Sequence, residues 1–360
     1  MKITDVRACQ PATPDSPADW RTSLGQILVA IDTDAGLTAY GIGGGGFAGI
    51  HIVRTVLRDL LVGCDPSDVE SLTREMLEQT LAYGQKGVVV MAVSGVDLAL
   101  WDLRGRSEGA SITDLLGGAK AASLPTYITV WDNDALPEAM QAGYQGFKLH
   151  LGAPGETNTS TSAFADRTAA QIHQAREIIG PDRELMVDAW MKWDLATSKA
   201  VLDRVAGCGL SWLEEPLPVT DEAGYAVLAV ESLVPIAGGE HEFTAASFQR
   251  LIDRRLHTVL QPDVCWCGGL TELIRIYEMG NAANIRVCPH RGSEMWSLPA
   301  IAALDPHPLA ESGRPWMTWV KGQPPIENGQ IKVPTGPGFG IEIDEASLPT
   351  MPTPAYDQWR

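Results

Sequence analysis

The sequence predicts an α/β protein in which a (β/α) barrel follows a smaller α+β domain. Its 360 residues exceed one small domain but suit a barrel with a companion. From about Leu124, short apolar strands alternate with helical stretches. Successive strand ends mostly lie about 20 to 27 residues apart, the length of one strand, one helix and two loops. Eight such units favour a closed barrel.

The N-terminal third, residues 1–124, has a different pattern and forms the predicted α+β domain. Two strands joined by a turn at Asp34 to Gly36 are expected from about Gly25 to Tyr40. Helical periodicity follows in three stretches. They are His51 to Leu61, Ser67 to Leu81 and the strongly apolar run 88–106. That apolar run should lie against a core.

The barrel is expected to span residues 125–320. Its predicted strands are Thr126 to Trp131, Phe147 to Leu151, Leu185 to Trp190, Leu210 to Glu215, Val234 to Glu240, Thr258 to Asp263, Ile285 to His290 and Pro308 to Ser312. A polar stretch at 152–164 predicts an exposed loop between the second and third strands. Proline and glycine dominate the tail, 321–360, which is expected to return to the first domain.

Composition excludes several classes of protein. The net charge of −18 and the absence of a basic cluster argue against a nucleic-acid partner. No stretch approaches 18 uninterrupted apolar residues, and no charged segment followed by an apolar run opens the chain, so we expect a cytoplasmic protein without a membrane partner. The 6 cysteines are scattered, which indicates reduced packing residues rather than a disulfide framework or zinc site.

Three carboxylates stand at corresponding ends of predicted barrel strands. They are Asp188, Glu214 and Glu240, each 26 residues from the last. Strand ends in a parallel barrel open on one face, so these acids would repel one another unless a cation lies between them. Oxygen ligands without a histidine or cysteine in the same register favour Mg²⁺. The alternative is that each acid caps a helix or pairs with a surface Lys or Arg.

The neighbouring strand ends carry a candidate acid/base pair, Asp263 and His290. An aspartate bonded to one imidazole nitrogen fixes the tautomer and raises the basicity of the other. Across the barrel mouth, Lys148 and His150 share one strand face, and either is a candidate second base, enediolate stabiliser or carboxylate ligand. Lys148 pairing with the acids is the alternative. Glu311 would donate a hydrogen bond to a substrate carboxylate if its neighbours keep it protonated.

Two loops are candidate lids over the barrel mouth. The run Gly41 to Gly46 satisfies GxGxxG, yet it ends a hairpin rather than the first strand of a parallel unit, so a nucleotide site is disfavoured and a flexible lid is expected. The segment before the hairpin carries Trp20 and Arg21, which are candidate contacts to the far end of a substrate. A surface loop with a packed tryptophan is the alternative.

With these residues in view, the chain resembles the enolase superfamily, in particular its mandelate racemase subgroup and the L-rhamnonate dehydratase-like sugar-acid dehydratases. The matching phrases are VDLALWDLRG, LLGG, MVDAWMKWD, WLEEPLP, GGEHE, LQPDVCWCGGLTE, VCPH and PGFG, from about residue 96 to 340. The resemblance implies a modified (β/α)7β barrel with a capping domain completed by the C-terminal tail. It also implies Mg²⁺ on the three acids, an Asp263–His290 dyad, substrate contact by Glu311, and self-association into a homo-oligomer.

This sequence departs from the subgroup at two places that bear on substrate. Many members have KxK at the second strand, where this chain has Lys148 followed by His150. After His290, the run HRGSEMW brings Arg291 and Glu294 near the site as candidate substrate contacts. The substrate therefore need not be rhamnonate.

The resulting expectation is a carbon–oxygen lyase acting on a small sugar acid. Mg²⁺ would chelate an aldonic or aldaric acid, the α-proton would be removed, and loss of the 3-hydroxyl assisted by protonated His290 would give a 2-keto-3-deoxy acid. A racemase or epimerase working from both faces of the substrate is an alternative. A catalytically silent sugar-acid binding protein and, from the glycine run, a nicotinamide-dependent oxidoreductase are the others.

Overall fold

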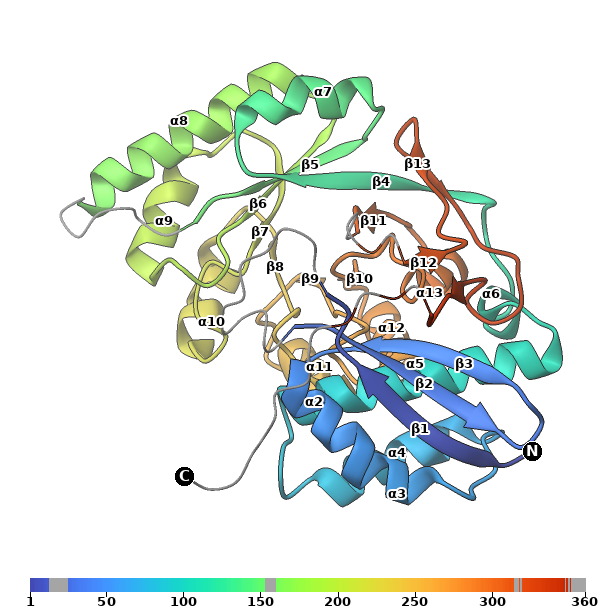
Figure 1. Ribbon diagram of the computed structural model, residues 1–360. Coiled ribbons are helices and arrows are strands. Elements are labelled where there is room, and N and C mark those ends of the chain that lie inside the picture. The colour runs from blue at the N-terminus through green and yellow to red at the C-terminus, as the bar shows by residue number, and fades with distance from the viewer. Residues whose placement is uncertain are drawn as a thin grey trace.

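The computed structural model describes residues 1–12, 25–152, 160–313, 317, 319–346, 348 and 350. The protein consists of an N-terminal part built on a small antiparallel sheet and a larger α/β barrel (Figure 1). Trp20, Arg21 and residues 153–159 of the predicted polar loop lie outside the described residues.

The N-terminal part contains the predicted hairpin and one strand that the sequence pattern did not indicate. Strands β1 (Ile3–Cys9), β2 (Ile27–Thr33) and β3 (Thr38–Gly43) form an antiparallel sheet in that order. The helical segments of this part are α2 (Gly46–Ile52), the π-helical η1 (Val53–Leu57), α3 (Arg58–Leu61), α4 (Val69–Thr80), α5 (Val88–Glu108) and α6 (Ile112–Leu115). The three predicted helical stretches therefore form.

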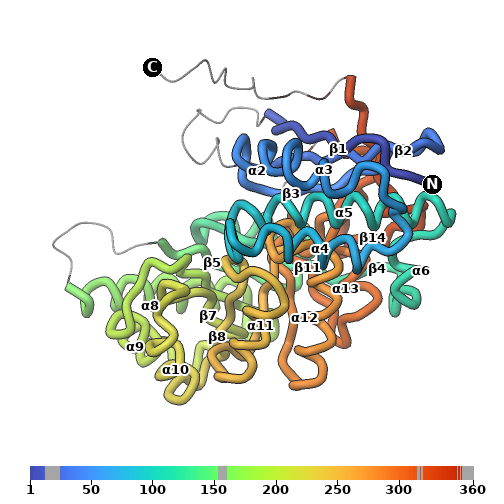
Figure 2. The backbone as a smooth tube through the Cα atoms, turned by 90° about the horizontal axis from the view of Figure 1, so that it is seen from below, coloured from blue at the N-terminus to red at the C-terminus, as the bar shows by residue number. Residues whose placement is uncertain are grey.

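Helix α5 runs between this sheet and the barrel (Figure 2). The glycines of the predicted lid lie against α5, and Gly44 also lies beside Trp266 of the barrel. A Cβ on Gly41 would lie 2.2 Å from the carbonyl oxygen of Gly95, and one on Gly43 would lie 2.4 Å from that of Met91. The run is buried, and Gly41 and Gly43 allow a strand to approach a helix closely. A lid role for this run stays a prediction. Within the described residues, we find no helix with both the length and the apolar character needed to span a bilayer.

The barrel strands run parallel, and each predicted strand appears. They are β4 (Ser123–Val130), β5 (Gly146–His150), β6 (Glu184–Asp188), β7 (Leu210–Glu214), β8 (Ile236–Gly238), β9 (Val259–Leu260), β10 (Arg286–Val287) and β11 (Ala310–Glu311). Strand β4 is longer than predicted, β5 has the predicted length, and the others are shorter. Pairing runs in chain order from β4 to β10, and β11 pairs with β4 from the other side.

Helices follow the barrel strands in the expected alternation. They are η2 (Asn133–Ala135), α7 (Leu136–Gln141), α8 (Thr161–Ile179), α9 (Leu195–Arg204), α10 (Glu222–Glu231), α11 (Thr244–Asp253), α12 (Leu270–Ala282) and α13 (Leu298–Leu304). Inside the barrel, Tyr127, Met186 and Trp212 belong to one buried apolar cluster. This packed interior closes the lower end of the barrel, so polar side chains gather at the carboxyl ends of the strands.

The tail contacts both parts of the protein. It contains β12 (Val320–Lys321), β13 (Ile326–Glu327), β14 (Gln330–Lys332) and β15 (Glu342–Ile343). Strand β14 pairs with the start of β4. Farther along, Phe339 is fully buried and its amide donates to Asp102 of α5, at 3.0 Å. The tail therefore returns to the N-terminal part, as its composition predicted.

Candidate active site

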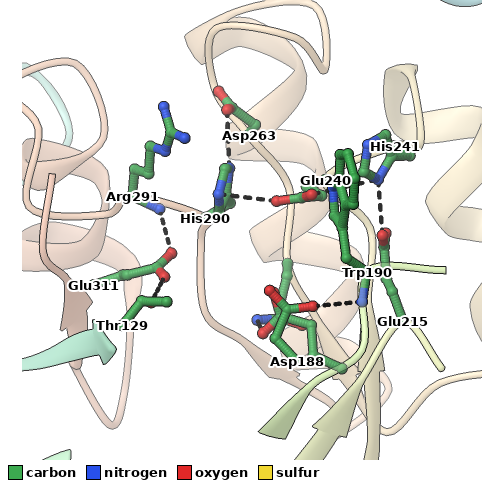
Figure 3. A network of polar contacts seen from close by, with 12 residues as sticks. Thr129, Asp188, Trp190, Glu215, Glu240, His241, Asp263, His290, Arg291 and Glu311 are labelled. Carbon is green, nitrogen blue, oxygen red and sulfur yellow. Dashed lines mark hydrogen bonds and ion pairs between the residues drawn. The ribbon is translucent and has the colours of Figure 1, made fainter. Parts of the chain in front are cut away.

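The strand ends bring the predicted site residues to one region of the barrel mouth (Figure 3). His150, Asp188 and Glu214 stand side by side because β5, β6 and β7 pair in that register. Their side chains therefore share one face of the sheet. Glu240 and Asp263 follow β8 and β9, and both side chains contact His290.

His290 occupies a central position between two carboxylates. Its Nδ1 lies 3.1 Å from Oδ2 of Asp263, and its Nε2 lies 2.8 Å from Oε2 of Glu240. Burial opposes the charged imidazolium, but the Glu240 carboxylate and the bond to Asp263 outweigh it and raise the pKa of His290 to about 10. In this arrangement His290 carries a proton at neutral pH.

Each of the three predicted metal ligands pairs with one of the predicted bases. The pairs are Asp188 with His150, Glu214 with Lys148, and Glu240 with His290, each at 2.8 Å. A cationic or protonatable group therefore faces every one of these acids. The alternative considered from the sequence, in which Lys148 pairs with the acids, is the arrangement that the structure contains.

Glu214 is the most deeply buried of the three acids. Its oxygens also accept hydrogen bonds from Trp212 Nε1 at 3.1 Å and from Gln261 Nε2 at 2.6 Å. Burial raises the pKa of Glu214 to about 8, and the negative charges of Asp188, Glu311 and Glu240 act in the same direction against Lys148. Burial and the neighbouring acids therefore oppose the ionisation of Glu214, and a divalent cation would relieve this repulsion.

A second set of atoms has the spacing of a metal site. Ligand atoms of Glu215, Glu240 and His241 all lie within 4.8 Å of one another. His241 Nδ1 is 2.7 Å from Glu215 Oε2 and 3.4 Å from Glu240 Oε1. This group contains one of the three predicted metal ligands, Glu240. The other two, Asp188 and Glu214, pair with His150 and Lys148 instead.

Lys148 is almost fully buried between two acids. Its Nζ lies 2.8 Å from Glu214 Oε1 and 2.9 Å from Glu311 Oε1. Burial disfavours its charge, but Glu214, Glu311 and Asp188 outweigh that effect and hold the pKa of Lys148 well above its usual value. A lysine that keeps its proton so firmly is a poor general base.

Glu311 differs from its predicted state. Burial disfavours its charge, but Lys148 and His290 outweigh burial and lower the pKa of Glu311 to about 2. It accepts hydrogen bonds from the Thr129 hydroxyl at 2.5 Å and from the Arg291 amide at 2.8 Å. The condition for hydrogen-bond donation is therefore not met, because its neighbours are cations rather than acids.

The predicted substrate contacts within the described residues are Arg291 and Glu294. The Arg291 guanidinium points away from Glu311, although its backbone amide binds that carboxylate (Figure 3). Glu294 is buried, and a Cβ added to Gly313 would lie 2.6 Å from its Cγ. Glu294 therefore lies in packed protein next to Gly313.

Two exposed tryptophans flank His150 at the barrel rim. Trp131 is 70% exposed and its ring centre lies 4.1 Å from that of His150, and the ring centre of Trp190 lies 6.2 Å from that of His150. A cavity of about 360 Å³ opens here, lined in part by Trp131, His150 and Arg167. The rim thus offers apolar surface to a bound molecule beside the His150–Asp188 pair.

Sequence reasoning missed several residues of the site. Glu215 and His241 were read only as parts of the phrases WLEEPLP and GGEHE, and Thr129 and Gln261 were not noticed. Their signal was position: each lies within two residues of a predicted strand end. A histidine directly after Glu240 was the clearest available sign.

Two family descriptions match the chain. Residues 5–117 match "Mandelate racemase / muconate lactonizing enzyme, N-terminal domain", and residues 133–347 match "Enolase C-terminal domain-like". The first match runs from within β1 to the end of α6, and the second covers the barrel from η2 onward, without β4, and most of the tail.

The chain is similar to characterised and structurally solved proteins over nearly its whole length. An L-rhamnonate dehydratase of Saccharopolyspora erythraea is 34% identical over 334 residues, which are 89% of this chain and 84% of that protein. The L-talarate dehydratase of Polaromonas sp. JS666, solved with Mg and L-glucarate, is 27% identical with a TM-score of 0.84, covering 98% of both chains. A racemase of Streptomyces coelicolor A3(2) with bound magnesium is 26% identical with a TM-score of 0.85, covering 96% of this chain and 98% of that one.

Proposed function

The chain belongs to the mandelate racemase/muconate lactonizing enzyme family of the enolase superfamily, and from that membership we propose that it is a Mg²⁺-dependent sugar-acid dehydratase. The substrate is an aldonic or aldaric acid, and the product is a 2-keto-3-deoxy acid. The named dehydratases among its relatives support a hydro-lyase, and the rhamnonate dehydratase makes rhamnonate-like acids the first substrates to test.

One observation carries this proposal: His290 joins the acidic cluster to an orienting aspartate. Its Nε2 reaches Glu240 and its Nδ1 reaches Asp263. A protonated imidazole in that position can give its proton to a leaving hydroxyl group, which departs as water.

The donor chemistry of the site fits Mg²⁺, which prefers carboxylate oxygens. Asp188, Glu214 and Glu240 are the ligands that we propose, because their charges accumulate at one place and raise the pKa of Glu214. When bound, the ion supplies positive charge that makes the α-proton of a carboxylate substrate more acidic. Glu215 and His241 form the competing ligand set with Glu240, supported by their 4.8 Å grouping.

The remaining residues of the site have two proposed roles: His150 accepts a proton, and Lys148 keeps one. His150, oriented by Asp188 at 2.8 Å, is the proposed acceptor of the α-proton. Lys148 stays charged and holds Glu214 and Glu311 in place. The α-proton leaves C2, the 3-hydroxyl leaves with a proton from His290, and the resulting enol tautomerises to the keto acid.

A racemase or epimerase is the second candidate, and the two histidine–carboxylate pairs favour it specifically. His150 with Asp188 and His290 with Asp263 offer one base from each side of the mouth. Such a pair exchanges a proton between the faces of one carbon without losing a hydroxyl group. The racemase of S. coelicolor among the solved neighbours is consistent with this reading.

The test is a screen of sugar acids with Mg²⁺, following keto-acid formation with semicarbazide and solvent deuterium by mass spectrometry. We expect a keto acid from wild type and a loss of about 10³-fold or more in His290→Asn, since the acid is removed. Glu184→Gln, at the opposite end of the strand that carries Asp188, is the matched control and should retain activity. Deuterated substrate isomers without keto acid would identify an epimerase instead.

The ligand sets are separated by calorimetric titration of Mg²⁺ into the variants. We expect Glu214→Gln to weaken Mg²⁺ binding strongly and His241→Asn to weaken it little. The reverse order would show that Glu215 and His241 provide the ligands. Full activity of both Glu214→Gln and His290→Asn would contradict the whole assignment.

A further inference from the structure

The N-cap residue of helix α12 provides no capping side chain. The cap comes from a residue of another helix. The N-cap residue of α12 is Gly269, which has no side chain to accept the first amides. Asp97 of helix α5 takes that role. Its Oδ1 accepts from the Thr271 amide at 3.1 Å, and it also accepts from the Leu270 amide.

The contact is buried and its other hydrogen bonds are complete. Asp97 has no exposed surface, and its Oδ2 accepts from the hydroxyl groups of Thr73, at 2.7 Å, and Thr271. Trp101 Nε1 donates to the same Thr271 hydroxyl at 2.9 Å, and Ser94 Oγ accepts from the Gly268 amide at 2.9 Å. These α5 residues are spaced three and four apart, so they present one polar face to the barrel.

The barrel side is shaped for this approach. A Cβ on Gly269 would lie 2.2 Å from Asp97 Oδ1, and Gly269 itself has φ +87. Gly268 before it has φ +110. Both positions therefore require glycine, because any side chain would be strained there and one at 269 would displace the carboxylate.

The turn that leads into α12 also carries Asp263, the partner of His290. The Asp263 carbonyl accepts from the amides of Trp266 and Cys267, at 2.9 and 2.7 Å. One carboxylate oxygen accepts from the Cys265 amide at 2.8 Å, which leaves the other aimed at His290. The orientation of the Asp263 carboxylate is thus set by the turn that follows it. Asp97 binds the other end of this turn, where α12 begins.

A second link of the same kind reaches the next loop. Helix α11 also lacks a capping side chain at its N-cap residue, Phe243, within the described structure. Glu272, in the first turn of α12, accepts from the Ala245 amide at 2.6 Å, and the Cys267 carbonyl accepts from the Thr244 amide at 2.9 Å. Helix α11 begins four residues after Glu240, so this link fixes the loop that carries Glu240.

We propose that Asp97 is a positioning residue of the active site: by capping α12 across the domain contact, it sets the loops that hold Asp263 and Glu240. Its catalytic consequence rests on the proposed function, whereas its effect on the two loops does not. The N-terminal part therefore acts on the barrel through a defined carboxylate.

The test compares Asp97→Ala with a matched variant on the same helix, Asp102→Ala. Asp102 is equally buried and accepts two backbone amides, from Tyr40 and Phe339, each at 3.0 Å, away from α12. Hydrogen exchange followed by mass spectrometry reports each loop without any substrate. We expect Asp97→Ala to raise exchange about tenfold at 263–273 and 243–248, the size expected for a lost cap. Asp102→Ala should instead affect residues near 40 and 339.

The kinetic test measures kcat and KM separately on the substrate that the screen identifies. Misplacement of Asp263 should lower kcat about tenfold or more in Asp97→Ala with little change in KM. Asp97→Asn, which keeps an oxygen acceptor for the amides, should recover most of kcat. If Asp97→Ala fails to fold, Thr271→Val should raise exchange in the same two segments.

Unchanged exchange at both loops in the folded variants, or an equal rise in Asp102→Ala, would overturn the inference. Absence of dehydratase activity in wild type would contradict the proposed function instead. The exchange result would still decide whether Asp97 holds the loops, so the two failures are distinguishable.

Discussion

Lys148 carries its charge in a position with almost no access to solvent. Its two carboxylate partners, Glu214 and Glu311, come from strands β7 and β11 on either side of it. Removing one partner of a buried ion pair leaves the other charge uncompensated, which costs more than the pair contributes. The lysine therefore determines whether these two acids can remain buried together.

We predict that Lys148→Met lowers the free energy of unfolding by about 3 kcal/mol, because Glu214 and Glu311 then face each other without a cation. Urea unfolding followed by circular dichroism measures the change. Lys199→Met, which removes a surface ion pair with Glu231, is the control and should leave the midpoint near wild type. A Lys148→Met protein as stable as wild type would show that the acids are neutral when buried.

The sequence predicted most site residues because strand ends in a parallel barrel share one face. Asp188 and Glu214 lie in register, and His290 reaches both Asp263 and Glu240. Glu215 was missed for a physical reason. Alternation along a strand points it away from Glu214, but its φ of +36 breaks the alternation and lets its carboxylate meet His241.

Side-chain partners were predictable only in part. The spacing of acids indicated repulsion that a cation must relieve, yet it did not show that Lys148, His150 and His290 would each pair with one acid. The protonation of Glu311 depends likewise on its neighbours: burial raises its pKa, but Lys148 and His290, from distant parts of the chain, lower it.

At the scale of helices and strands, the apolar run 88–106 predicted helix α5. It did not predict that polar residues on one face of this helix would bind α12. Ser94, Asp97 and Trp101 all bind the start of α12, which lies about 170 residues away in sequence. Local periodicity shows that a helix is buried; it does not show which partner fills the hydrogen bonds of the few polar residues along it. The close approach of the glycine run to α5 was not predictable for the same reason, since it depends on that packing.

We predict that Asp97 makes stability fall with rising pH. Burial raises its pKa to about 7 from 3.8, so between these values the unfolded chain alone releases the proton. The stability that Asp97 contributes is complete below pH 3.8 and is lost as pH rises through 7. Unfolding free energies of wild type minus Asp97→Asn should therefore decrease over this range, by about 1.4 kcal/mol per pKa unit at most.

His257 provides a control of opposite sign. Burial lowers its pKa to about 4 from 6.5, so its contribution is present above pH 6.5 and is lost as pH falls through 4. The difference between wild type and His257→Gln should increase with pH over that interval. Parallel slopes for the two differences would contradict both assignments.

At the scale of the whole molecule, the tail ties the N-terminal part to the barrel. Strand β14 pairs with β4, the Ile341 carbonyl accepts from Arg106 at 2.7 Å, and Glu345 pairs with Arg7 at 2.8 Å. Its composition predicted a return to the first part but gave no register, because prolines and glycines leave no periodic pattern to align.

We predict that Phe339→Ala lowers the free energy of unfolding by about 3 to 5 kcal/mol, the usual cost of removing a buried phenylalanine. Phe339 is fully buried beside Asp102, so the cavity forms where the tail meets α5. Thermal unfolding measures the loss, and Tyr83→Ala, at an 82% exposed position, is the control. A small loss in Phe339→Ala would mean that the tail contributes little to holding the two parts together.

The borrowed cap of α12 also bears on the order in which the chain acquires structure. Asp97 and Thr271 are separated by 174 residues, so their contact closes a very long loop and forms late compared with neighbouring strands and helices. During synthesis the aspartate leaves the ribosome long before the helix that it caps. The loops bearing Asp263 and Glu240 therefore gain this support only after Thr271 has been made and has met Asp97.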